Sequence, residues 1–224
     1  MKVRLISKST SPETLEFEGM NNAQDIVAYC ARVSNPSNQV NTETSERLIR
    51  YLVKHQHWSP LEMVNACLEI ETTRDIAHQI VRHRSFAFQE FSQRYANPEE
   101  QGDMFEYSEA RLQDTKNRQN SIETSDVELQ AWWDAQQKFV TEISKKIYDE
   151  ALKKGIAKEQ ARKVLPEGLT KTKLYMNGSL RSWIHYIELR SANGTQKEHM
   201  EIAHACAKVI AGIFPLMSEL QQGE

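Results

Sequence analysis

Apolar residues recur along the chain with two different periods, and each period predicts one kind of element. Between 64 and 71 every second side chain is apolar, which is the period of a strand with one buried face. Elsewhere apolar residues recur every three or four positions, which predicts amphipathic helices. We therefore expect strands at 3–7, 64–71 and 172–176, and helices at 22–33, 42–56, 74–81, 126–153, 179–190 and 196–211.

The longest predicted helix, 126–153, has an apolar side that aromatic and aliphatic residues supply. These residues are Trp132, Trp133, Phe139, Val140, Ile143, Ile147 and Leu152. The stretch before the helix, 97–125, is polar and contains Pro98 and Gly102, so we expect a mobile insertion there.

The order of the predicted elements favours an α+β fold. Runs of helix are interrupted by a few non-adjacent strands, whereas a parallel α/β fold would show alternating βαβ units. The chain contains no GxGxxG motif, so any nucleotide site is not of the Rossmann kind. A chain of 224 residues, 39% of them hydrophobic, can bury a sizeable core in one large domain or two small ones.

The composition excludes several classes of protein. With a formal net charge of −3, the chain is a poor candidate for non-specific binding to duplex nucleic acid, which needs an extended basic surface. The first twenty residues lack the apolar stretch of a signal peptide, and the longest nearly apolar run, 209–217, is too short to cross a bilayer. Cys30, Cys67 and Cys206 have no CxxC spacing, which favours buried thiols in a reducing, cytoplasmic compartment over disulfides or a zinc site.

A cluster of cations in the segment RHRSFAFQEFSQRY, 82–95, contrasts with the acidic chain around it. Arg82, Arg84 and Arg94 outnumber Glu90, and the phenylalanines between them lower the local dielectric, which strengthens a paired cation and penalises an unpaired one. Guanidinium groups match phosphate and carboxylate oxygens, so the cluster points to a small anion. A structural ion-pair network through Glu90, or a set of solvated arginines, is the alternative, and spacing alone leaves both open.

The segment HWSPLE, 57–62, has two compatible interpretations. Ser59 as N-cap, Pro60 at the first helical position and Glu62 three residues after Ser59 have the spacing of a capping box. A helix that begins there also offers unpaired N–H groups to an anion, and His57 and Ser59 would add donors.

The helix predicted at 179–190 adds further cations. Its apolar face contains Leu180, Trp183, Ile184 and Ile187, and its opposite face contains Arg181, His185 and Glu188. Arg190 falls beside Trp183, at the edge of the apolar face. It is either a snorkelling side chain that the helix dipole stabilises or a half-buried cation that binds an anion. Arg162, before Pro166, has the simpler interpretation of a surface arginine.

Together these segments resemble the signature of the flavin-dependent thymidylate synthases. RHR at 82–84, followed after seven residues by Ser92 and then by QRY at 93–95, matches the family's signature motif. CARVS at 30–34, HWSPLE, ARKVLP at 161–166 and LRSWIHYIELR at 180–190 occur in the family's order. The resemblance implies a single catalytic domain over 1–224, with a mostly antiparallel central sheet flanked by helices and a variable insertion at 97–125.

The resemblance also implies roles for the residues at matching positions. Arg190 would activate the substrate by stabilising the ionised uracil ring nitrogen. The residues implied to contact FAD are Ser59, Arg82, His83, Arg84, Glu90, Ser179, Leu180, Arg181 and His185. Those implied to hold deoxyuridine monophosphate (dUMP) are Gln79, Arg82, Glu90, Ser92, Gln93, Arg94, Arg162 and Arg190.

The implied reaction is the reductive methylation of dUMP to dTMP. Reduced FAD supplies a hydride, 5,10-methylenetetrahydrofolate supplies the one-carbon unit and NADPH re-reduces the flavin, so neither a cysteine nucleophile nor a metal is required. The family is usually a homotetramer whose active sites several subunits share. Met63 and His185 depart from the family's usual His and Asn, although the ring of His185 can still donate to a flavin.

Two alternatives accompany this resemblance. Ser92 could be a nucleophile, but a serine needs an adjacent base, so we expect it to position the phosphate and ring instead. The rival function is a non-catalytic single-stranded RNA-binding module, in which Phe86, Phe88 and Phe91 would stack on bases. The net negative charge and the ordered motifs weigh against that function.

Overall fold

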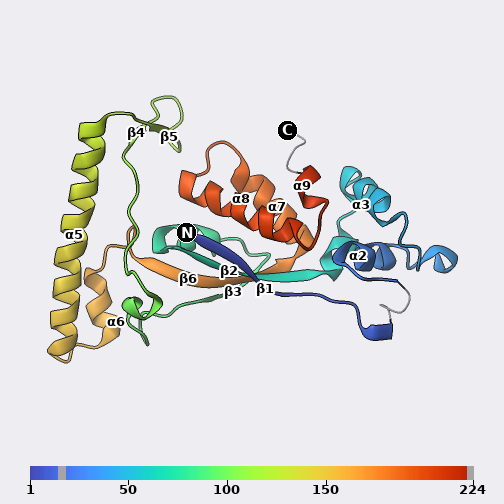
Figure 1. Cartoon of the computed structure of the whole chain (residues 1–224), viewed down its shortest axis with the longest axis horizontal. Coiled ribbons are helices and arrows are strands. Elements are labelled where there is room, and N and C mark those ends of the chain that lie inside the picture. Colours follow the sequence, from blue (N-terminus) through green and yellow to red (C-terminus); the bar gives the residue numbers. More distant parts are fainter. Residues whose placement is uncertain (15–18, 221–224) are drawn as a thin grey trace.

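The computed structural model describes residues 1–14 and 19–220, and a four-stranded antiparallel sheet lies at its centre (Figure 1). The strands lie in the order β1-β2-β6-β3, and each neighbouring pair is antiparallel. Their bounds are β1 Lys2–Lys8, β2 Asn65–Thr73, β6 Lys171–Ser179 and β3 Ala87–Glu90. The predicted α+β class and the antiparallel central sheet are therefore confirmed.

Helices connect and flank these strands. Their bounds are α2 Ala23–Ala31, α3 Ser45–Lys54, α4 Arg74–Ile80, α5 Val127–Lys153, α6 Lys158–Ala161, α7 Leu180–Ser191, α8 Lys197–Ala211 and α9 Met217–Leu220. Short 3₁₀ turns are η1 Pro36–Asn38, η2 Ser59–Met63, η3 Pro98–Gln101 and η4 Arg162–Val164. None of the helices found within the described residues is long and apolar enough to cross a membrane.

One face of the sheet is buried under α7 and α8, which lie across it in Figure 1. Leu68 and Ile70 of β2 and Leu174 of β6 are fully buried there, and burying a side chain of this size contributes about 1.5–3 kcal/mol. Trp183 of α7 is also fully buried, and its Nε1 donates to the carbonyl oxygen of Ala66 across 3.1 Å. This contact fixes α7 against the sheet at the end where β6 leads into it.

The opposite face of the sheet carries charged side chains. Glu69 of β2 is only 2% exposed, and its carboxylate accepts hydrogen bonds from Arg4 at 2.7 and 3.1 Å. The hydrogen bond from Arg4 holds the pKa of Glu69 below its usual range. Ion pairs therefore stabilise this face, while apolar contacts stabilise the other.

The predicted elements agree with the observed ones along most of the chain. The strands predicted at 3–7 and 64–71 are β1 and β2, and the one predicted at 172–176 extends to Ser179 as β6. The predicted helices correspond to α2, α3, α4, α5, α7 and α8. The sequence did not predict β3, because its four residues lie inside the arginine-rich segment and are too few to show a period.

The capping box predicted at HWSPLE is wrong. Residues Ser59–Met63 form the 3₁₀ turn η2, whose N-cap is Trp58 and lacks a side-chain capping hydrogen bond. The carboxylate of Glu62 instead accepts hydrogen bonds from Ser179 and Arg181, more than a hundred residues later. A tertiary contact has therefore taken the place of the local one.

The apolar side of α5 is exposed in the single chain. Trp132, Trp133, Phe139, Val140, Ile143 and Ile147 are between 36% and 60% exposed. The buried residues of α5 are instead Gln137, Thr141, Tyr148 and Ala151, and Figure 1 shows the helix beside α6, away from α7 and α8. A contiguous exposed apolar surface of this kind marks an interaction site.

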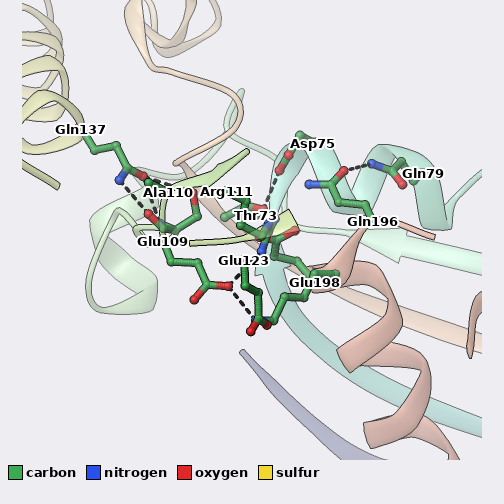
Figure 2. Close-up of polar contacts among 12 residues, drawn as sticks. Thr73, Asp75, Gln79, Glu109, Ala110, Arg111, Glu123, Gln137, Gln196 and Glu198 are labelled. Carbon is green, nitrogen blue, oxygen red and sulfur yellow. Dashed lines mark hydrogen bonds and ion pairs between the residues drawn. The ribbon is translucent and has the colours of Figure 1, made fainter. Parts of the chain in front are cut away.

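The polar segment 97–125 contains η3 and a hairpin of β4 Arg111–Gln113 and β5 Ser121–Glu123. The side chain of Gln137 on α5 donates to the carbonyl oxygen of Ser108 across 2.8 Å. Arg111 lies 2.5 Å from Glu198 of α8 (Figure 2). These contacts tie the segment to two helices, and its mobility stays a prediction.

Candidate active site

The arginine-rich segment forms a tight turn between α4 and β3. The amide of Phe86 donates to the carbonyl oxygen of His83 across 3.3 Å. The Phe86 ring is buried and packs edge-on against Trp183, with 4.8 Å between ring centroids. This anchor holds the turn against α7 and leaves Arg82 and Arg84 exposed on either side of the half-buried His83.

An open groove of about 840 Å³ lies beside this turn. Its lining residues are Val81, Arg82, Arg84, Phe86 and Phe88. Within the described residues neither arginine has an ion-pair partner, and both are exposed. Unpaired guanidinium groups next to apolar walls suit an anionic ligand that has an aromatic part.

His83 and Arg190 bring the two predicted basic segments together. The Nε–H of Arg190 donates to Nε2 of His83 across 2.9 Å, although 107 positions separate them in the sequence. Only an unprotonated ring nitrogen can accept that hydrogen bond. Burial, and then the charge of Arg190, lower the pKa of His83 to about 4, so the imidazole is neutral near pH 7.

Arg190 is a half-buried cation at the end of α7. In the ranges 1–14 and 19–220 no carboxylate pairs with it, and its contact with His83 uses Nε alone. Its charge also helps to lower the pKa of the buried His199 to about 3, after burial itself. The terminal nitrogens of the guanidinium group remain available to an anion. This favours the interpretation of Arg190 as a half-buried cation that binds an anion over that of a snorkelling side chain.

Glu62 joins η2 to the start of α7. Its oxygens accept hydrogen bonds from Oγ of Ser179 and from Nη1 of Arg181, the latter at 2.7 Å, and these bonds lower the pKa of the carboxyl. Ser182 donates to the carbonyl oxygen of Ser85 across 3.2 Å, so the same helix end also contacts the arginine-rich turn. Three segments that are distant in sequence therefore meet here.

Most of the predicted flavin residues lie at this junction, whereas Glu90 lies away from it, paired with Leu174 of β6. Ser59 begins η2, and the exposed ring of His185 lies 4.5 Å from that of Trp58. Leu180 differs, because its side chain is fully buried and its amide donates to the carbonyl oxygen of Val64 across 2.9 Å. Its predicted contact with FAD stays a prediction, and neither that side chain nor that amide is available to make it.

Glu90 lies at the other end of β3. It accepts hydrogen bonds from Thr172 at 2.9 Å and from Arg74 at 3.2 Å. Its ion pair is therefore with an arginine on α4 and not with the arginines of its own segment. The structural network that the sequence left open as an alternative does not account for those arginines.

The SQR part of the signature follows β3 and approaches α6. Arg94 lies 3.4 Å from Glu159 of α6, and Arg162 begins η4 directly after that helix. Gln93 is buried, and its Nε2 has no hydrogen-bond partner in the part of the chain that the structure describes. Ser92 is half-buried, and within the described residues no histidine or carboxylate bonds to its hydroxyl.

Several predicted flavin residues are separated along β6 from the SQR part of the signature. Arg181 and His185 follow Ser179, where the strand ends, whereas Glu90, which precedes the SQR residues, pairs with Leu174, five positions earlier in β6. Five residues of strand span roughly 17 Å at about 3.3 Å per residue. Some of the predicted contacts are therefore separated within the described chain, although Arg82 and Arg190 of the nucleotide group lie at the flavin end.

Gln79 reaches a buried row of polar groups. Its Nε2 donates to Oε1 of Gln196 across 2.8 Å, as Figure 2 shows. Its Oε1 lies 3.3 Å from Nδ1 of His199, and Nε2 of His199 lies 3.1 Å from the hydroxyl of Tyr186. Sequence reasoning singled out neither Gln196, His199 nor Tyr186, since each resembles an ordinary helix residue.

Comparisons with known proteins agree on one family, and the matches extend over nearly the whole chain. Residues 17–216 match the family model described as thymidylate synthase complementing protein. The chain is 48% identical to a probable flavin-dependent thymidylate synthase of Paramecium bursaria Chlorella virus 1, over 98% of each chain. It is 49% identical to the flavin-dependent thymidylate synthase of Synechocystis sp., over 97% of this chain and 98% of that one.

A solved structure with a similar fold is the crystal structure of a UMP/dUMP methylase, PolB, from Streptomyces cacaoi bound with 5-Br dUMP. It superposes with a TM-score of 0.80 at 25% sequence identity. The match covers 98% of this chain and 93% of that one. The likeness therefore includes the sheet, the helices that cover it and α5.

Proposed function

The chain belongs to the family of thymidylate synthase complementing proteins, and on that premise we propose that it is a flavin-dependent thymidylate synthase. In the balanced reaction dUMP, 5,10-methylenetetrahydrofolate, NADPH and a proton give dTMP, tetrahydrofolate and NADP⁺. The observation that carries the proposal is the 2.9 Å contact between Arg190 and His83. It joins the RHR motif to the helix that carries the other basic residues.

The groove beside the arginine-rich turn supports FAD as the cofactor. Arg82 and Arg84 offer two guanidinium groups to a pyrophosphate, and Phe86 and Phe88 offer apolar walls. The other residues that would hold it are Ser59, His83, Glu90, Ser179, Arg181 and His185. Bound there, FAD supplies hydride chemistry that no side chain of this chain supplies.

Arg190 is the residue that we propose to act on the substrate. A half-buried guanidinium that lacks a carboxylate partner among the described residues favours an anion beside it. It would therefore lower the pKa of the uracil ring nitrogen and stabilise its ionised form. His83 holds the guanidinium by its Nε and, being neutral, adds no charge that would repel Arg190 or attract the substrate anion.

The phosphate and sugar of dUMP would bind at the SQR end of the site. Arg94 and Arg162 approach the same short helix, α6, and supply cations for a phosphate. The remaining contacts would come from Gln79, Arg82, Glu90, Ser92 and Gln93. We propose Ser92 as a positioning group, because no base lies at its hydroxyl within the described residues.

We also propose a homotetramer with shared active sites. The exposed apolar side of α5 supports assembly, since such a surface is costly to leave in water. The separation of the flavin and nucleotide groups along β6 supports sharing, since a second subunit could bring its own SQR end to the flavin groove. Each active site would then take residues from more than one chain.

Methylenetetrahydrofolate and NADPH are the co-substrates that the proposed reaction requires. The described chain holds Cys30, Cys67 and Cys206 as free thiols. Free thiols support the reducing, cytoplasmic compartment that we propose for it.

Activity and absorbance together test the function. Purified protein should be yellow and should form dTMP from dUMP, methylenetetrahydrofolate and NADPH, and leaving out any one of the three should stop product formation. Colourless protein that makes no dTMP even with added FAD would contradict the proposal. Binding to single-stranded RNA that weakens steeply with salt, without a flavin spectrum, would favour the rival function instead.

A further inference from the structure

A row of four polar side chains lies behind the contact between Arg190 and His83. The row runs from Tyr186 through His199 and Gln79 to Gln196, and we call it the buried polar row after its two buried members, since Gln79 and Gln196 are half-buried. His199 is 0% exposed, and Tyr186 is 1% exposed. The ring of Tyr186 also packs edge-on against that of His83, with 4.9 Å between centroids. The row therefore contacts both the RHR turn and α7.

The hydrogen bonds of the buried polar row all run in one direction, so that each side chain donates to the next one from Tyr186 to Gln196. Because Nε2 of Gln79 donates to Gln196, its Oε1 faces Nδ1 of His199 and accepts from it. The proton of His199 is therefore on Nδ1, and Nε2 accepts from the hydroxyl of Tyr186. If the Gln79 amide alone were reversed, its NH₂ group would face the N–H of His199, and its oxygen would face the oxygen of Gln196. Neither pair could form a hydrogen bond.

We propose that His199 is a positioning residue that holds the amide of Gln79 in one orientation for a uracil nucleotide. The inference rests on the proposed function, because Gln79 is one of the residues implied to bind dUMP. One N–H and one lone pair of the amide are used inside the row, so one N–H and one lone pair remain for a ligand. A fixed N–H donor matches a carbonyl oxygen of uracil, whether or not the neighbouring ring nitrogen keeps its proton.

The buried polar row is uncharged, which suits its place near Arg190. Burial, followed by the charges of Arg190 and His83, lowers the pKa of His199 to about 3. Burial raises the pKa of the Tyr186 phenol, so that it keeps its proton. A carboxylate in the row would pair with Arg190 and neutralise the charge that we assign to the substrate anion.

Equilibrium binding of dUMP to the oxidised, FAD-loaded protein tests this inference without turnover. The variants are His199→Leu, Gln79→Ala and the double variant, each followed by calorimetry and by the flavin absorbance change. His199→Leu should raise the Kd for dUMP about tenfold at unchanged FAD content, the loss expected for one well-placed hydrogen bond. Since His199 acts through Gln79, the double variant should bind no more weakly than Gln79→Ala alone.

Ile202→Val is the matched control, because Ile202 is fully buried on the same helix but is apolar. It should leave the Kd for dUMP within about twofold, since it only reduces packing. Tyr186→Phe removes one hydroxyl, keeps the ring and should raise the Kd about threefold, so it serves if His199→Leu does not fold. A wild-type Kd in either variant, or additive losses in the double variant, overturns the inference. Wild-type protein that binds no dUMP overturns the proposed function itself.

Discussion

A methyl group on Gly178 would lie 2.4 Å from the nearest ring carbon of Phe86. Gly178 is the last residue but one of β6, and Phe86 belongs to the turn that carries Arg82 and Arg84. The missing side chain lets the ring lie directly over the strand. The arginine-rich turn is therefore held in place by a glycine that is far from it in the sequence.

Gly178→Ala should displace Phe86 and loosen the turn. Overpacking of this kind costs about 1–3 kcal/mol, so we expect a lower melting temperature and a lower FAD content in the purified protein. Gly168→Ala is the control, because its new methyl group would have only an ordinary contact, 3.9 Å from Asp75. A melting temperature equal to that of wild type in Gly178→Ala would contradict the packing argument.

Arg190→Ala should abolish turnover and leave flavin bound. We expect kcat to fall by about a hundredfold or more, because the variant removes the charge that stabilises the ionised uracil. Arg190→Lys keeps the charge but loses the planar fork, so it should recover only part of the rate. The control is Arg47→Ala, an exposed arginine on α3. Near-wild-type activity in Arg190→Ala would remove this residue from the mechanism.

His83 should make the fold less stable in mild acid. Its pKa is about 4 in the folded chain, below its ordinary value of 6.5, so the unfolded chain takes up the proton first as pH falls. Its contribution to the free energy of unfolding is complete above about pH 6.5 and is lost as pH falls toward 4.

His83→Gln keeps a hydrogen-bond acceptor but has no titrating ring. The free energy of unfolding, measured by urea denaturation, should therefore differ less between pH 7.5 and pH 5 in this variant than in wild type. Equal differences in both proteins would refute this. The pKa of His199 is also lowered in the folded chain, so His199 too reduces the stability as pH falls. Part of the pH dependence of stability should therefore remain in His83→Gln.

Glu62→Gln should weaken the junction between η2 and α7. The side chain is 36% exposed, so solvent screening limits the loss of stability to about 1 kcal/mol or less. The lowered pKa of the carboxyl means that its contribution is present above about pH 4.5 and is lost as pH falls through the folded value. Flavin fluorescence should show faster release of FAD than in Glu46→Gln, whose carboxylate pairs with Arg50 on α3. Equal release rates would separate Glu62 from cofactor binding.

Charges on the apolar side of α5 should dissociate the assembly. Phe139→Glu with Ile143→Glu introduces two carboxylates where the side chains are 60% and 44% exposed in the single chain. We expect wild type to sediment as a tetramer and the double variant as a smaller species. Lys146→Glu, an exposed site on the same helix, controls for the added charge. A tetrameric double variant would exclude this side of α5 as the interface.

Sequence periodicity predicted well the elements that bury one face. The alternation in β2 and the stripe that includes Trp183 in α7 both follow from contact with the same core, so a local pattern carried the necessary information. The apolar side of α5 had an equally clear pattern, but no local rule says whether such a side faces a core or another chain.

The links between segments could not be predicted from the residues alone. Arg190 and His83 are each conspicuous, yet nothing in their spacing says that they form a hydrogen bond. Glu62 had a sufficient local explanation as part of a capping box, and its true partners come 117 and 119 positions later. Family resemblance supplied the roles of the signature residues, whereas His199 lies outside the matched motifs, so the resemblance assigned it no role.

The separation along β6 between the flavin groove and the SQR end of the proposed site has a genetic consequence. Under the proposed assembly, a chain that is defective at its flavin end still carries a sound nucleotide end, and the reverse holds for a chain that is defective at the other end. Two inactive alleles of opposite kinds, expressed in one cell, should therefore complement each other in mixed oligomers. Two alleles of the same kind should not. Selection on this enzyme would then act on combinations of subunits as well as on single chains.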